Sequence, residues 1–130
     1  MKKIKVSTLA VTIALATWSM PASAVPISWN AGTADWFMAG NWTPMQVPTN
    51  LDDASVNNAG TANANGSVQV NELNIGRVTS AASATGTVNV TSGNLTGNGA
   101  GSLHVGLTDN QAPGILAGDA NGTLSVDGNV

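Results

Sequence analysis

The chain has 130 residues, the length of one typical domain, and only 8% of them are charged. It contains four Lys and Arg against seven Asp and Glu, no Cys and no Tyr, whereas Gly and Asn supply 15 residues each and Thr supplies 14. Scarce basic residues argue against nucleic-acid binding, and scarce helix formers argue against a helical bundle. Because 42% of the residues are hydrophobic, disorder is not expected. The composition therefore indicates a β-rich protein with many turns.

Residues 1–24 have the pattern of a secretory signal peptide. Three lysines lie among the first five residues, and residues 6–20 are uncharged and largely apolar. Pro21-Ala22-Ser23-Ala24 then places small residues where a signal peptidase reads them, so we expect cleavage after Ala24. The alternative is a membrane anchor, but an apolar run of about 15 residues is shorter than the roughly 20 that span a bilayer.

Removal of this segment changes the charge of the chain. Arg77 then remains as the only Lys or Arg, and all seven acidic residues are retained. We expect an acidic mature chain with no transmembrane segment, exported through the inner membrane to the cell surface or outer membrane, or secreted. Such a chain should be weakly attracted to anionic surfaces.

Residues 25–60 contain all the aromatic residues of the predicted mature chain, which are Trp29, Trp36, Phe37 and Trp42. The Gly, Pro and Asn content of this region indicates short strands joined by turns. The three tryptophans are weak candidates for a sugar-stacking platform. The alternative, which we favour, is that they plug one end of the structure, because the terminal unit of a repeat protein must shield the core.

From residue 61 to residue 130 two short elements alternate. One has the form G-[ST]-[VL]-x-V and the other has the form L-x-[IV]-G. The first occurs at Gly66–Val70, Gly86–Val90 and Gly122–Val126, and the second at Leu73–Gly76 and Leu103–Gly106. From Leu73 to Val88 and from Val88 to Leu103 the spacing is 15 residues, and the next step, from Leu103 to Leu124, is 21 residues. Thr108–Asp119 provides room for the additional residues as a loop. This alternation of two elements indicates a repeating unit.

Each apolar-polar-apolar triplet places two side chains on one face of a short strand. A single unit buries too little apolar area to be stable alone, so the units must stack. We predict an all-β, right-handed parallel β-helix (a β-solenoid) with a Trp-containing N-terminal cap. An antiparallel sandwich also uses short, regularly spaced strands, but it would usually have longer strands and an aromatic core.

The set of motifs resembles the N-terminal part of an autotransporter passenger domain. The resemblance covers residues 1–130. It rests on the exported N-terminus, on Ser28-Trp29-Asn30, Gly40-Asn41-Trp42 and Val47-Pro48, and on the repeats that follow. It implies a bacterial type V secreted protein whose β-helix is carried to the cell surface by a C-terminal translocator barrel. A related interpretation is a surface-layer or biofilm-matrix β-helix that lacks its own barrel.

The chain departs from that family pattern because no part of it could form the barrel, which needs many strands of about ten residues. It also stops within a repeat, at Val126–Val130. We therefore expect an N-terminal fragment of a longer protein, with an expected role as a stalk for adhesion or cell-surface interaction. We also expect a host-surface or glycan ligand as a partner. The alternative hypothesis is a carbohydrate-active or carbohydrate-binding β-helix protein.

The polar residues that could form a metal or catalytic site are expected to have structural roles instead. Asp119–Gly122 is reminiscent of a calcium loop but lacks its other oxygen ligands, so we expect a turn. Asp52-Asp53 is expected to be a solvated turn, since adjacent acids on an extended chain point to opposite faces. His104 is expected on the surface, because it is the middle residue of the triplet Leu103-His104-Val105.

No catalytic or metal-binding group is expected. Nucleophilic catalysis needs a base beside an activated nucleophile, whereas His104 is the only histidine and Arg77 is the only mature cation. A Gly-rich phosphate loop is also missing. We expect a non-enzyme that needs no cofactor.

Overall fold

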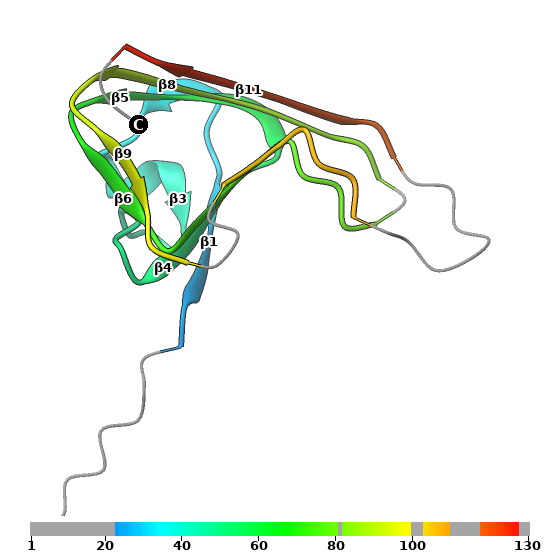
Figure 1. Cartoon of the computed structure of the whole chain (residues 1–130), viewed down its shortest axis with the longest axis horizontal. Helices are drawn as coiled ribbons and strands as arrows, with labels where there is room; N and C mark the ends of the chain where they lie inside the picture. The colour runs from blue at the N-terminus through cyan, green and yellow to red at the C-terminus, as the bar shows by residue number, and fades with distance from the viewer. Residues whose placement is uncertain (1–22, 81, 100–102, 110–117, 128–130) are drawn as a thin grey trace, which may run out of the picture.

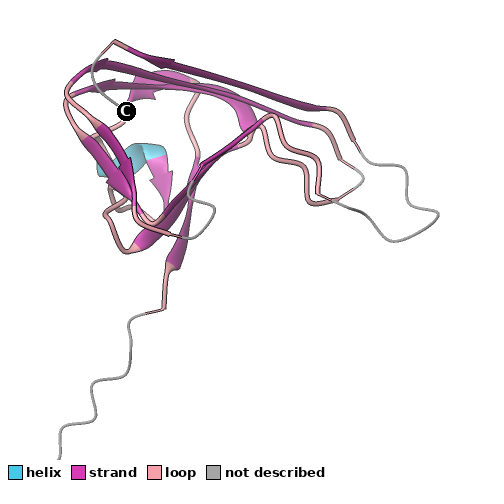
Figure 2. Ribbon diagram, viewed as in Figure 1, coloured by secondary structure: helices cyan, strands magenta, loops and turns pink. Residues whose placement is uncertain are grey.

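The computed structural model describes residues 23–80, 82–99, 103–109 and 118–127. In this part of the chain, strands of three sheets surround a narrow core (Figures 1 and 2). A three-residue 3-10 helix, η1 (Ala39–Asn41), is the only helical element of these ranges. The prediction of an all-β protein with parallel strands is confirmed.

The first sheet has five strands in the order β10-β7-β4-β1-β3. Its strands are β1 (Val25–Trp29), β3 (Trp42–Thr43), β4 (Asp52–Val56), β7 (Glu72–Ile75) and β10 (Leu103–Val105). All neighbours in this sheet are parallel except β1 and β3, which are antiparallel. The short strand β3 therefore occupies the outer edge of β1.

The second sheet has four parallel strands in the order β11-β8-β5-β2, and the third pairs β6 with β9. The strands of the second sheet are β2 (Thr33–Asp35), β5 (Asn58–Asn65), β8 (Ala84–Ser92) and β11 (Ala120–Val126). Those of the third are β6 (Val68–Val70) and β9 (Leu95–Gly97). The chain visits the sheets in turn, so that β4, β5 and β6 form one pass and β7, β8 and β9 form the next (Figure 1).

The core lies between the three sheets and is built from small and aliphatic residues together with three tryptophans. In the first sheet, Ala54 pairs with Leu73, and Leu73 pairs with Leu103. The inward residues of the inner passes are fully or almost fully buried; they include Ile27, Val56, Ala62, Val68, Val70, Ile75, Val88 and Val90. Each pass thus covers the apolar side chains of the pass beneath it, which is how short strands bury enough area to be stable.

The glycine of the L-x-[IV]-G element has a conformational role. Gly76 and Gly106 both have φ near 60°, in the left-handed region that residues with a Cβ seldom adopt. They follow β7 and β10, which pair in register. The repeated motif therefore encodes the same bend after equivalent strands of two passes.

The sequence repeat did not predict every strand partner. Gly86–Val90 pairs with Gly122–Val126 in register, as the motif predicts. Val68–Val70, in contrast, lies in the third sheet and pairs with β9. The strand beneath β8 is β5, whose Ala62 and Ala64 pair with Val88 and Val90. The three G-[ST]-[VL]-x-V elements therefore do not all lie in equivalent strands, and β5 carries small alanines where β8 and β11 carry the apolar residues of the motif.

Several expected segments lie wholly or partly outside the described residues. They are the signal peptide up to residue 22, most of the Thr108–Asp119 loop, and the last three residues. Strand β1 begins at Val25, immediately after the expected cleavage position at Ala24. The expected boundary between cap and repeats, at residue 60, lies within β5. Across the ranges that are described, no helix is long and apolar enough to cross a membrane.

Candidate functional site

Trp29, Trp36 and Trp42 form one buried cluster. Their exposed fractions are 3% for Trp29 and 1% for both Trp36 and Trp42. Trp42 meets each of the other two rings edge to face, with centroids 4.8 Å from Trp29 and 4.7 Å from Trp36. This edge-to-face geometry is one that aromatic pairs prefer, and it adds to the gain from burial.

Two of the three indole N–H groups donate hydrogen bonds to backbone carbonyls. Trp29 Nε1 donates to the Gly32 carbonyl at 3.0 Å, and Trp42 Nε1 donates to the Trp36 carbonyl at 2.8 Å. Because the rings are buried, none of them offers a free face to a sugar in this conformation. The cluster belongs to the same end of the sheets as β3, which covers the edge of β1.

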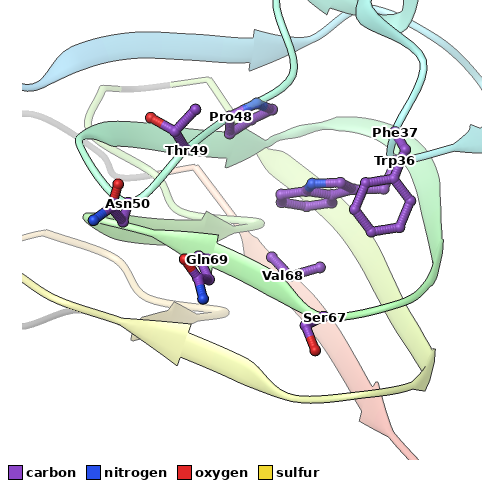
Figure 3. A pocket seen from close by; sticks show the side chains of 8 residues that line it. All are labelled: Trp36, Phe37, Pro48, Thr49, Asn50, Ser67, Val68 and Gln69. Atoms are coloured by element: carbon purple, nitrogen blue, oxygen red, sulfur yellow. The ribbon is translucent and has the colours of Figure 1, made fainter.

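A pocket of about 240 Å³ lies beside this cluster. Trp36 and Phe37 form one side of it, residues 48–50 form the opposite side, and residues 67–69 form its base (Figure 3). Phe37 is 39% exposed, in contrast to the buried Trp36. The pocket therefore has an aromatic wall that solvent can reach.

The loop that carries one wall of the pocket is fixed by Asp52. Its Oδ2 accepts hydrogen bonds from the Thr49 backbone N–H at 2.8 Å, from Thr49 Oγ1 at 2.6 Å and from Gln46 Nε2 at 3.3 Å. Asp52 is 3% exposed and begins β4. Such a buried carboxylate needs these donors to replace water.

The expectation of a solvated turn at Asp52-Asp53 was thus wrong. Both residues lie in β4 and their side chains point to opposite faces, as an extended chain requires. Asp53 accepts a 2.7 Å hydrogen bond from Asn71 Nδ2 in the next pass. The turn that we expected at these acids instead lies before them, at Thr49–Leu51.

A second polar cluster joins the last two described passes. Arg77 Nη1 lies 2.7 Å from Glu72 Oε1, and Arg77 Nη2 lies 3.0 Å from Asp109 Oδ2. His104 Nδ1 lies 2.9 Å from Asn74 Oδ1 and 3.4 Å from Glu72 Oε1. Hydrogen bonding to Asp109 raises the pKa of Arg77; burial opposes this rise and the attraction of both carboxylates supports it. The positive charge of Arg77 lies between negative charges from two passes, so this cluster is suited to holding those passes together.

The sequence did not predict this cluster, because Arg77 and His104 were considered separately. His104 is the middle residue of its strand triplet, as expected, but its side chain is only 21% exposed. The signal was present in the repeat, because His104 and Asn74 hold the same position of L-x-[IV]-G and pair in β10 and β7. Asn74 itself is 9% exposed, although the motif predicted an outward position.

The expected turn at Asp119–Gly122 was also wrong in part, because β11 begins at Ala120. Gly122 is required there for close packing, since a Cβ would lie 2.2 Å from the Ile75 carbonyl oxygen. No group of three or more His, Asp or Glu side chains that could hold a metal ion occurs in the parts of the chain that the structure describes. Comparison with known protein families, curated proteins and solved structures found no match.

Proposed function

We propose that this chain is the N-terminal part of an autotransporter passenger domain, a right-handed parallel β-helix used as a rigid surface stalk. Its function is mechanical: stacked passes hold adhesive or self-associating parts away from the cell. The signal-like N-terminus and the resemblance of the motifs support export by this route. The observation that carries the proposal is the difference between the two ends of the stack of sheets.

The N-terminal end of the first sheet is closed. Strand β3 runs antiparallel to β1 and covers the edge at which another parallel strand would pair. Behind it lie the buried rings of Trp29, Trp36 and Trp42. A terminal unit of a repeat protein has this task, because it must shield the core and block edge pairing.

The other end of the described stack is open. Strands β10 and β11 lie at the margins of the first and second sheets. Leu103 and Val105 are 43% and 40% exposed, whereas their partners in β7, Leu73 and Ile75, are buried. A further pass with the same pattern would pair with these edges and cover these side chains. This end therefore presents strand edges and apolar side chains of the kind that pair with a further strand.

A test of the proposal follows the chain in cells that export it. Edman sequencing of the exported protein should give Val25 as the first residue, and protease added to intact cells should cleave the chain from the cell surface. A periplasmic marker protein serves as the control for cell integrity. Retention of the chain inside intact cells would contradict a surface role.

The reading frame beyond Val130 provides a second test. The proposal requires further strand-and-turn repeats and then a segment of amphipathic strands that can form the translocator barrel. A stop codon directly after Val130 would contradict the autotransporter assignment.

A further inference from the structure

We infer that the pocket between Phe37 and the loop at residues 48–50 is a binding site for a neutral saccharide unit. The pocket has a volume of about 240 Å³ and lies on the closed end of the stack. It shares Trp36 with the tryptophan cluster, but its exposed aromatic ring is that of Phe37. The inference concerns this pocket alone and does not depend on how the chain is secreted.

The aromatic wall suits the apolar face of a sugar ring. Phe37 is 39% exposed, and its backbone N–H donates to Asp35 Oδ1 at 2.8 Å. A Cβ added to Gly66 would lie 3.3 Å from Phe37 Cζ, so the ring is packed close to the Gly66 backbone. The ring is therefore positioned before any ligand arrives, which lowers the entropic cost of binding.

The opposite wall and the base supply groups that can both donate and accept hydrogen bonds. Asn50 and Gln69 are exposed carboxamides that line the pocket (Figure 3). Each carboxamide has an acceptor oxygen and a donor NH₂ group. A sugar hydroxyl likewise donates and accepts, so the two kinds of group are complementary.

The absence of charge in the pocket lining favours neutral ligands over anionic ligands of the same size. None of the eight residues that line the pocket is ionisable. The nearby Asp52 carboxylate is engaged by Thr49 and Gln46. A ligand with a carboxylate or phosphate group would find no counterion there and would meet the negative field of an acidic chain. A neutral polyhydroxyl compound meets the requirements of both walls.

The test is an NMR titration of the purified protein with D-glucose, D-galactose, D-mannose and N-acetylglucosamine. The resonances to follow are the Phe37 ring protons and the side-chain amides of Asn50 and Gln69. A ligand of about 12 heavy atoms should bind with a dissociation constant in the range of about 1–10 mM. D-Galacturonate is the matched ligand control, because it differs from galactose by its carboxylate, and it should bind at least about 10-fold more weakly.

Variants show whether the sugar binds in the pocket or elsewhere on the surface. Phe37→Ala should weaken binding about 10-fold or more, whereas Phe37→Tyr should retain it. Met38→Ala is the matched control, because Met38 is adjacent, is 58% exposed and does not line the pocket. Should Phe37→Ala fail to fold, Gln69→Ala replaces it, and a loss of affinity of several-fold is again expected.

Three outcomes would overturn the inference. They are the absence of shifts with all four sugars up to about 50 mM, equal binding of galactose and galacturonate, and shifts at these residues with an uncharged extended octapeptide but with no sugar. The far-UV circular dichroism of each variant shows whether its strands are intact. Failure of sugar binding by a folded protein leaves the stalk proposal standing, because that proposal is tested by export and by the reading frame.

Discussion

Trp42 Nε1 donates a 2.8 Å hydrogen bond to the backbone carbonyl of Trp36, and the two indole rings meet edge to face at an interplanar angle of 73°. One residue begins β3 and the other follows β2. Their contact joins the two ends of the segment that leads from β2, in the second sheet, to β3, at the edge of β1. The end of the stack is therefore held by both ring packing and a buried hydrogen bond.

Truncation of this cluster should unfold the closed end. We expect Trp36→Ala to lower the free energy of unfolding by about 3–5 kcal/mol, because a large buried side chain leaves a cavity. Trp36→Phe should cost less, and Met38→Ala, on the exposed neighbour, should change stability by less than about 0.5 kcal/mol. Urea unfolding followed by circular dichroism measures all three. Unchanged stability of Trp36→Ala together with lost glycan binding would contradict the role as a cap.

A methyl group should disrupt the contact between two passes at Gly86. A Cβ at this position would lie 1.7 Å from the backbone carbonyl oxygen of Val56, and the backbone cannot yield as a flexible side chain can. Gly86→Ala should therefore destabilise the protein by about 1–3 kcal/mol or more. Gly40→Ala is the matched control, since nothing lies within 4 Å of its added Cβ. Equal thermal midpoints for the two variants would show that the passes are packed less closely than described.

The buried carboxylate of Asp52 should be necessary for the loop before β4. Asp52→Ala removes the acceptor of the Thr49 N–H and hydroxyl hydrogen bonds, and we expect a loss of about 1–3 kcal/mol. Asp52→Asn keeps an acceptor oxygen and should lose less. Asp127→Ala, at an exposed acid after β11, is the control for removal of one negative charge. A stability of Asp52→Ala equal to that of Asp127→Ala would refute this role.

The Arg77 cluster should stabilise the joint between two passes by a small amount. Arg77→Met is expected to cost about 1–2 kcal/mol, more than a fully exposed ion pair would contribute. The double-mutant cycle with Asp109→Asn should show a coupling energy of about 0.5 kcal/mol or more, which decreases at high salt. Additive effects in that cycle would mean that the ion pair contributes nothing measurable.

The pH dependence of the stabilisation by Arg77 follows from the direction of its pKa shift. The pKa of Arg77 is raised in the folded protein, chiefly by its hydrogen bond to Asp109. A raised pKa stabilises the folded state fully below the unfolded pKa, and the contribution is lost only as the pH rises through the folded pKa. The cost of Arg77→Met should therefore be the same at pH 8 and pH 10. A cost that falls across this interval would contradict a pKa raised by folding.

Strand positions with strong apolar alternation could be predicted from residues alone. Leu73-Asn74-Ile75, Leu103-His104-Val105 and Gly86–Val90 all lie in strands, because β-branched and aliphatic residues at every second position favour a half-buried strand. Strand β5 gave no such signal. Its inward residues Ala62 and Ala64 are buried as fully as any valine, but alanine does not favour strands.

The candidate pocket and the ionic cluster were beyond prediction for a related reason. Phe37 and Gln69 line one pocket although 32 residues separate them, and Arg77 and Asp109 are likewise separated by 32 residues. Only the pairing of whole passes brings such residues together. The repeat could have indicated that Asn74 and His104 adjoin, but not which charged residues gather around them.

The amino-acid sequence by itself determined the strand-forming triplets, the left-handed glycines after two of them and the alternation of buried and exposed positions, because these depend on local backbone geometry. The tertiary structure decided which strands became partners, how the tryptophans were buried and where the pocket formed. Those features depend on how complete passes fit against one another, and a close approach such as that between Gly86 and Val56 exists only when both are in place.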